Sequence, residues 1–175
     1  MILSPGGTTY HFFSLFLQLK RIIMPNTYSQ LYYHFVFSPQ NRESMIKKEF
    51  EKDLYKYIAG IINNLNQNLI QINGMPDHIH LLVRLKPNIT PSEFIQKVKS
   101  NSSRWINNNR FLPRKFSWQT GGGIFTIDYY RIDLVKEYII NQKEHHKITS
   151  FKKEYIDFLT QYNIEYKTEY LLEFF

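Results

Sequence analysis

Two histidines separated by one residue, His78 and His80, are the side chains of this chain best suited to chemistry. The stretch 78–85, which ends before Pro87, is predicted to be a β-strand. Side chains two positions apart in a strand point to the same side, so both imidazoles share one face. The opposite face is purely apolar and consists of Ile79, Leu81, Val83 and Leu85. Two imidazoles placed this way suit a divalent metal ion. Two histidines that are hydrogen-bonded at a sheet surface would give the same pattern.

Tyr138 and Gln142 form the second pair of interest, on a helix predicted over residues 131–146. Residues four apart are neighbours on one helix face. The two side chains therefore share one face of that helix. The alternative is that Tyr138 packs beside Leu134 and Val135 while Gln142 lies in solvent.

Other side chains near these pairs could take part in the same chemistry. Tyr129 and Tyr130 are rival nucleophiles, but neither has a ligand-type residue four positions further on. His146 lies one helical turn after Gln142 and could replace it as a ligand. His34, on the first predicted strand, either lies near this site or packs in the core.

The charge distribution favours a polyanionic partner. The chain has a formal net charge of +7. Residues 97–115 contain no acidic residue and six basic ones, which are Lys97, Lys99, Arg104, Arg110, Arg114 and Lys115. A segment whose charges are all positive indicates a patch that faces phosphates. We expect Lys97, Lys99, Arg104 and Arg110 to make the phosphate contacts. Cysteine is absent, which excludes disulfides and cysteine nucleophiles and accords with a cytoplasmic location.

The elements that must position these residues follow from hydrophobic periodicity and turn signals. A helix opened by Ser44 carries an apolar stripe, and Thr90 with Glu93 forms a capping box for the next helix. The predicted strands are 28–37, 68–73, 78–85, 116–119 and 124–127, and the last helix is 150–162. The order β-α-β-β-α-β predicts an α+β, ferredoxin-like antiparallel sheet with helices on one face. Both histidines would then lie on the open face, beside a C-terminal helix that carries Tyr138.

Residues 1–23 differ in character from the rest of the chain. The apolar run 12–19 is too short to span a bilayer, and its basic residues follow it, the reverse of a signal peptide. We expect Met24 to be the natural start, with 1–23 a non-native or mis-annotated extension and 24–175 a single domain. A short amphipathic anchor is the alternative, and we expect no membrane association.

Two motifs in this order resemble those of the HUH-type single-tyrosine transposases of small bacterial insertion sequences. The first is Met-Pro-Asp-His-Ile-His-Leu-Leu-Val at residues 75–83, and the second is Glu-Tyr-Ile-Ile-Asn-Gln at residues 137–142. The resemblance is to the IS200-like transposase family, including REP-associated tyrosine transposases, and it covers roughly residues 25–160. It implies that His78 and His80 bind Mg²⁺ or Mn²⁺, that Gln142 is a third ligand and that Tyr138 is the nucleophile.

The resemblance also implies a reaction and an assembly. The tyrosine attacks single-stranded DNA beside a hairpin, leaving a 5′-phosphotyrosine and a free 3′-OH, which preserves bond energy for rejoining. Tyrosine, with a pKa of about 10, is a poor nucleophile at neutral pH, and a metal helps by polarising the phosphate. Members are homodimers in which the tyrosine helix can complete the partner's site. Residues 121–123, all glycine, are either a flexible link for that exchange or a simple strand connection.

Three other functions compete with a mobile-element transposase. A domesticated relative would cut hairpins without moving its own gene, and the chain alone does not separate these two. A non-catalytic hairpin-binding protein on the same fold would bind DNA regardless of chelator or of Tyr138→Phe. A metallohydrolase using His78 and His80 would need an acidic general base.

Overall fold

The computed structural model describes residues 28–167. The predicted extension 1–23, the predicted start at Met24 and the tail after residue 167 lie outside these residues. Within the described range, none of the helices has the length and apolar character needed to cross a membrane. The elements are β1 (Leu31–Phe37), η1 (Gln40–Arg42), α2 (Lys48–Asn64), β2 (Asn68–Met75), β3 (His78–Leu85), α3 (Pro91–Asn108), β4 (Gly123–Ile127), η2 (Tyr129–Arg131), α4 (Ile132–Ile140), α5 (Gln142–His145) and α6 (Phe151–Gln161).

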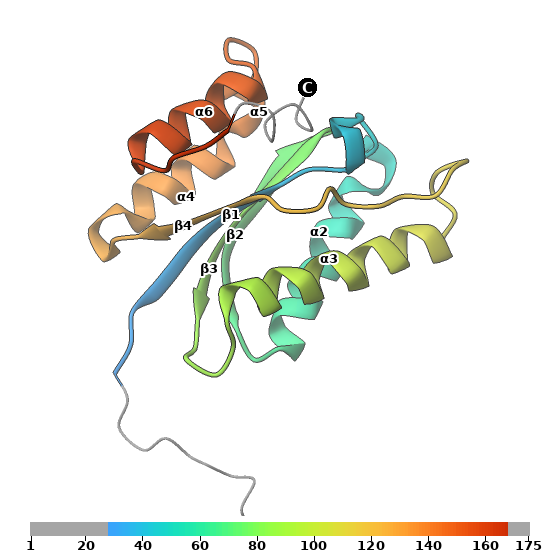
Figure 1. Ribbon diagram of the computed structural model, residues 1–175. Helices are drawn as coiled ribbons and strands as arrows, with labels where there is room; N and C mark the ends of the chain where they lie inside the picture. The colour runs from blue at the N-terminus through green and yellow to red at the C-terminus, as the bar shows by residue number, and fades with distance from the viewer. Residues whose placement is uncertain (1–27, 168–175) are drawn as a thin grey trace, which may run out of the picture.

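The four strands form one sheet in the order β2-β3-β1-β4, and every neighbouring pair is antiparallel. The order of strands along the chain, with α2 between β1 and β2 and α3 between β3 and β4, is the ferredoxin-like arrangement (Figure 1). The predicted fold class is therefore confirmed. The two central strands, β1 and β3, carry the histidines.

The larger core lies between the sheet and the helices α2 and α3. The odd-numbered residues of β3 form the apolar face that the alternation predicts, and they pack against the apolar stripes of both helices. The predicted cap of α3 is confirmed, because the Thr90 side chain accepts a hydrogen bond from the Glu93 amide with Pro91 in the first turn. These contacts fix which face of β3 carries His78 and His80.

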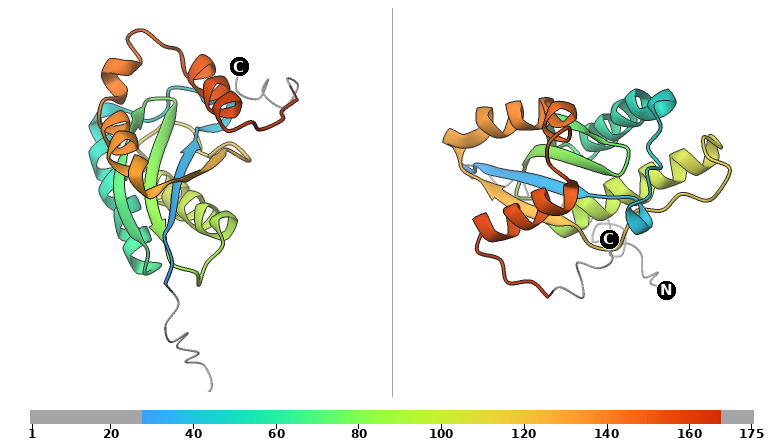
Figure 2. Two further views of the ribbon diagram at one scale, coloured as in Figure 1. Left: turned by 90° about the vertical axis from the view of Figure 1, so that its left-hand side faces the viewer. Right: turned by 90° about the horizontal axis from the view of Figure 1, so that it is seen from above.

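The second face of the sheet is covered, contrary to the prediction that it is open. The helices α4, α5 and α6 lie across it, on the other side of the sheet from α2 and α3 (Figure 2). This face has an apolar cluster of its own, in which Leu82 of β3 and Ile139 of α4 are fully buried beside Tyr32 and Ile127. An apolar surface of this kind is stabilised when helices exclude water from it. The covering helices enclose both histidines.

The start of α2 and the strand predicted at 116–119 differ from the prediction by more than the shifts of one to three residues at other element ends. Helix α2 begins at Lys48, and Ser44 does not cap it, because Met45 and Ile46 are buried in the core before the helix starts. The Ile46 amide donates to the Pro76 carbonyl, which directs this stretch towards the β2–β3 turn. The predicted strand 116–119 is reduced to one bridge, between Pro39 and Trp118.

The helix predicted over residues 131–146 is interrupted at Asn141, which separates α4 from α5. The Asn73 side chain on β2 donates to the carbonyls of Ile139 and Ile140, at 2.9 Å each. In a continuous helix those carbonyls would accept from amides four residues further on. The side chain of Asn73 therefore replaces the helical hydrogen bonds at this point, and Gln142 begins a new short helix.

A candidate metal centre beside a tyrosine

The β2–β3 hairpin positions His78. Gly74, within β2, lets the two strands approach closely beside the turn, because a Cβ atom there would lie 2.2 Å from the His78 carbonyl oxygen. His78 Nδ1 donates to Asp77 Oδ1 at 2.8 Å, and Arg42 lies 3.6 Å from the other Asp77 oxygen. Phe151 stacks on the His78 imidazole, with centroids 4.0 Å apart and planes within 6°. The ring is thus fixed in orientation, and only its Nε2 atom faces the interior.

His80 is fixed in a similar way by a second histidine. Its Nδ1 lies 2.9 Å from Nε2 of His34 on β1, and both side chains are almost completely buried. Burial is the main reason why the pKa of His80 is lowered to about 4, and burial followed by the proximity of His80 lowers the pKa of His34 as well. Both imidazoles are therefore neutral at pH 7. A neutral imidazole is the form that binds a metal ion.

His146 and Glu154 approach the same point from the C-terminal helices. His146 Nδ1 donates to the Thr149 carbonyl at 2.9 Å, which leaves Nε2 facing inwards. Oε2 of Glu154 lies 3.8 Å from His78 Nε2, 3.6 Å from His80 Nε2 and 3.3 Å from His146 Nε2. Burial alone would raise the pKa of Glu154, but the surrounding histidines outweigh it and lower that pKa. The carboxyl group is ionised at neutral pH.

These four residues, which we call the histidine–glutamate cluster, are His78, His80, His146 and Glu154. One ligand atom of each lies within 4.8 Å of all the others. Among the residues that the structure describes, His80 Nε2, His146 Nε2 and Glu154 Oε2 are buried without a hydrogen-bond partner. Metal-ligating histidines usually donate their second ring nitrogen to a neighbouring group, as these do. The cluster could therefore bind a divalent metal ion.

Tyr138 and Gln142 also reach this cluster, although they lie on separate helices. The Tyr138 hydroxyl donates to Glu154 Oε1, and Gln142 Nε2 donates to the same oxygen at 3.1 Å. Gln142 is fully buried, and its Oε1 lies 3.4 Å from His78 Nε2. Burial, and then the Glu154 carboxylate, raises the pKa of Tyr138. The structure thus places the predicted nucleophile and the three predicted ligands around one carboxylate.

Glu154 was not predicted as a site residue, although the sequence contains a signal for it. It lies on the apolar face of α6 between the buried positions Phe151 and Tyr155, where a charge is unusual. The replacement ligand considered for Gln142, His146, does lie in the cluster. The rival tyrosines do not, because Tyr129 and Tyr130 are 54% and 90% exposed on η2.

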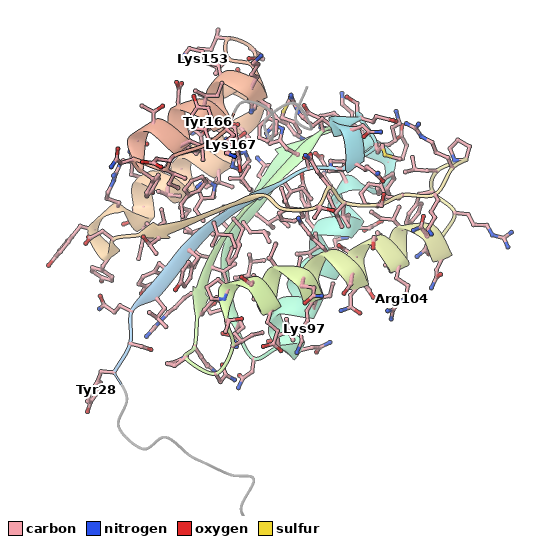
Figure 3. The ribbon with its side chains drawn as sticks, viewed as in Figure 1. Tyr28, Lys97, Arg104, Lys153, Tyr166 and Lys167 are labelled. Carbon is pink, nitrogen blue, oxygen red and sulfur yellow. The ribbon has the colours of Figure 1, made fainter. Side chains whose placement is uncertain are left out.

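The residues predicted to contact DNA lie on or after α3. Lys97 and Arg104 project from α3 on the side of the sheet away from α4–α6 (Figure 3). Lys97 pairs with Glu93 at 2.9 Å, whereas Arg110, just after the helix, is exposed. Lys99 turns inwards, and its ammonium group donates to the carbonyls of Gln119 and Gly121. Burial lowers the pKa of Lys99 to about 8.

Comparison with known proteins gives one family and two solved structures. The sequence pattern of the family described as "Transposase IS200 like" matches residues 27–142. The crystal structure of a protein from Deinococcus radiodurans R1, described as a "putative transposase", superimposes with a TM-score of 0.55 at 21% identity. That match covers 67% of this chain and 94% of the other. A REP-associated tyrosine transposase bound to a REP hairpin gives a TM-score of 0.54 at 16% identity, covering 69% and 72%. No curated protein sequence matches the chain.

Proposed function

The chain belongs to the IS200-like transposase family, and from that premise we propose that it cleaves and rejoins single-stranded DNA through a covalent bond to Tyr138. The family makes the protein a transposase, an enzyme of DNA transposition and recombination. The observation that carries the proposed mechanism is the meeting of the Tyr138 hydroxyl with the histidine–glutamate cluster at Glu154. A tyrosine held against a metal-binding group suits covalent phosphoryl transfer, because the metal can polarise the phosphate that the tyrosine attacks.

The proposed reaction is a balanced exchange of one phosphoester for another. The Tyr138 oxygen attacks the phosphorus of a phosphodiester, and the bond from phosphorus to the 3′ oxygen breaks. The products are a 5′-phosphotyrosine and a free 3′-OH. The phenol proton passes to the Glu154 carboxylate, which Tyr138 already faces, and then to the leaving 3′ oxygen. In the reverse direction a 3′-OH attacks the phosphotyrosine, so no ATP is needed.

His78 and His80 would hold a divalent cation, Mg²⁺ or Mn²⁺, with Gln142 as a further ligand through Oε1. The contact of 3.4 Å between Gln142 Oε1 and His78 Nε2 supports that grouping. When bound, the ion supplies Lewis-acid polarisation of the phosphate. Asp77 orients His78 and His34 orients His80, each through a hydrogen bond to Nδ1, the ring nitrogen opposite the metal-binding Nε2.

The proposed substrate is a DNA hairpin with a single-stranded flank. The solved relative bound to a REP hairpin supports this class of substrate. Lys97, Arg104 and Arg110 would contact phosphates from the α3 side, and Lys99 would do so once it leaves its carbonyl partners. Assembly as a homodimer and a cytoplasmic location belong to the same proposal. Light scattering coupled to size-exclusion chromatography measures the assembly.

A covalent-trapping assay tests the proposal. Labelled hairpin DNA from the flanks of the gene is incubated with the protein and Mn²⁺ or Mg²⁺ and then separated on a denaturing gel. We expect a protein–DNA adduct that is absent with EDTA and absent in Tyr138→Phe. Tyr130→Phe is the matched control, because this tyrosine is exposed on η2 and should form the adduct normally. Hairpin binding by all variants without any adduct would instead favour the non-catalytic DNA-binding protein.

A further inference from the structure

We propose that His146 and Glu154 are themselves metal ligands, so that the centre offers three imidazoles and one carboxylate beside the amide oxygen of Gln142. This inference deepens the proposed function, because it concerns the metal centre of that same reaction. It assigns the site to α5–α6 as well as to β3. Both new ligands lie beyond residues 27–142, the part of the chain that the family pattern matches.

In each ring, the nitrogen that points away from the cluster makes a hydrogen bond, and this bond determines where the ring carries a hydrogen. Nδ1 of His78 faces a carboxylate and Nδ1 of His146 faces a carbonyl, and both of those oxygens can only accept. Nδ1 of each ring therefore bears a hydrogen, and Nε2 is the ring atom that faces the cluster. His80 completes the set when its Nδ1 donates to His34 Nε2. The Nε2 atoms of all three rings then face the same carboxylate oxygen, Oε2 of Glu154.

Electron-pair donors that face one another in a buried site repel unless a cation lies between them. Burying a charged atom without a partner is unfavourable. Glu154 is only 3% exposed, and among the described residues its Oε2 atom has no hydrogen-bond partner. A proton shared by His146 and Glu154 would satisfy those two atoms and leave His80 Nε2 buried without a partner. A metal ion would satisfy every member of the cluster at once.

The spacing of the donor atoms also suits an ion. Ligand atoms that each lie about 2.1 Å from a metal ion are roughly 3 to 4 Å from one another. The three distances from Glu154 Oε2 to the imidazole nitrogens are 3.3, 3.6 and 3.8 Å. Small side-chain adjustments would close the remaining gap, because the four atoms already lie within 4.8 Å of one another.

The composition of the centre predicts which metals it takes. Imidazole nitrogens suit transition metals, whereas Mg²⁺ prefers oxygen ligands and retains several waters. Three imidazoles with one carboxylate should therefore bind Mn²⁺, Co²⁺ or Zn²⁺ more tightly than Mg²⁺. Gln142 Nε2 donates to Glu154 Oε1 and orients the carboxylate, while Gln142 Oε1 stays beside His78 Nε2 as the further ligand. The Tyr138 hydroxyl on the same oxygen is held one carboxylate away from the ion.

Direct metal titration of the full chain tests the inference without reference to activity. Mn²⁺ and Mg²⁺ affinities are measured by calorimetry, and Co²⁺ is used as a spectroscopic probe of ligand number and type. We expect Glu154→Gln and His146→Gln each to weaken Mn²⁺ and Co²⁺ binding by at least about tenfold and to alter the Co²⁺ spectrum. Lys153→Gln, on the exposed face of α6, is the matched control and should bind like the parent chain.

Unchanged Mn²⁺ affinity and an unchanged Co²⁺ spectrum in both variants would overturn the inference, as would tighter binding of Mg²⁺ than of Mn²⁺. Circular dichroism checks that each variant is folded. If Glu154→Gln does not fold, Glu154→Asp keeps the charge but shortens the reach, and it should bind Mn²⁺ more weakly. The two proposals can fail separately. If the trapping assay gives an adduct but metal affinity does not depend on His146 and Glu154, only this inference is contradicted. If metal binding depends on both residues but no adduct forms, only the proposed reaction is contradicted.

Discussion

At the scale of single residues, the centre is built from buried histidines that are held neutral. His34 is packed among the rings of Phe125, Phe158 and Tyr138, and its Nε2 contacts His80. Water cannot solvate an imidazolium in this position, so protonation is disfavoured in the folded chain and not in the unfolded one. The same burial that prepares His80 for a metal therefore makes the protein sensitive to acid.

We predict that the metal-free protein loses stability as the pH falls below about 6.5, the unperturbed pKa of histidine. The unfolded chain then binds protons that folded His34 and His80 do not, so the free energy of unfolding decreases down to the folded pKa, about 4 for His80. One such histidine contributes about 2 kcal/mol of loss by pH 5. The pKa of His146 is raised, so protonation of this residue below pH 6.5 increases the free energy of unfolding. The two histidines with lowered pKa values, His34 and His80, outweigh that single increase.

Urea unfolding in EDTA at pH 7 and pH 5, followed by tryptophan fluorescence, measures this loss. The variant His34→Leu should lose about 2 kcal/mol less between the two pH values than the parent chain, because it lacks one titrating group. An equal loss in both proteins would show that His34 is not the source of the acid sensitivity.

Sequence reasoning found the residues whose roles follow from local spacing. His78 and His80 share a strand face because the strand period is two, and the alternating apolar residues made that face predictable. Glu154 and Asp77 were not predicted as site residues. Their roles depend on which atoms approach them from other elements, and such contacts have no local spacing. Whether a buried acid on α6 faces a histidine or a lysine is decided only by how α6 lies on the sheet.

At the scale of elements, the interruption between α4 and α5 decides where the ligands point. Periodicity predicts one helix here, since nothing in residues 131–146 is a strong helix breaker. The break comes from β2, where Asn73 captures two helix carbonyls. Boundaries of α3 and β3 were predictable because their caps and alternation are local. The boundary at Asn141 was not, because its cause is a side chain nearly seventy residues earlier.

We predict that Asn73→Ala destabilises the protein by about 1 to 2 kcal/mol, the net worth of two hydrogen bonds that are partly exposed. The amides of Lys143 and Glu144 should then compete for the freed carbonyls of Ile139 and Ile140. Urea unfolding measures the loss, and hydrogen exchange reports on those two amides. Asn68→Ala is the control, because this asparagine is exposed at the start of the same strand. A change in stability no larger than that of the control would mean that Asn73 does not hold the break.

At the scale of the whole molecule, the sheet separates two surfaces with different chemistry. The centre and Tyr138 lie between the sheet and α4–α6, whereas Lys97 and Arg104 project from α3 on the other side (Figure 3). A DNA hairpin held on the α3 side would be positioned without touching the centre, and only its single-stranded flank would pass to Tyr138. Phosphate contacts fix the position of DNA without taking part in the chemistry.

This separation leads to our last prediction, that loss of charge on α3 weakens DNA binding and leaves the metal centre intact. Arg104→Gln should lower hairpin affinity and reduce the slope of log affinity against log salt by roughly 0.7 to 0.9, the value for one phosphate contact. Lys97→Gln should have the smaller effect, because binding DNA must first disrupt its ion pair with Glu93. Fluorescence anisotropy at several salt concentrations measures both. Lys56→Gln, an exposed lysine of α2 paired with Asp53, controls for net charge.

Mn²⁺ affinity, and the amount of Tyr138 adduct at saturating DNA, should equal those of the parent chain in both α3 variants. Equal weakening by Lys56→Gln would mean that the protein attracts DNA by overall charge and not through α3. A lower adduct yield in Arg104→Gln at saturating DNA would mean that α3 also aligns the scissile strand. In that case hairpin recognition and cleavage would be coupled across the sheet. The first contact to alter would be the edge-to-face packing of Phe37, at the end of β1, against Trp118.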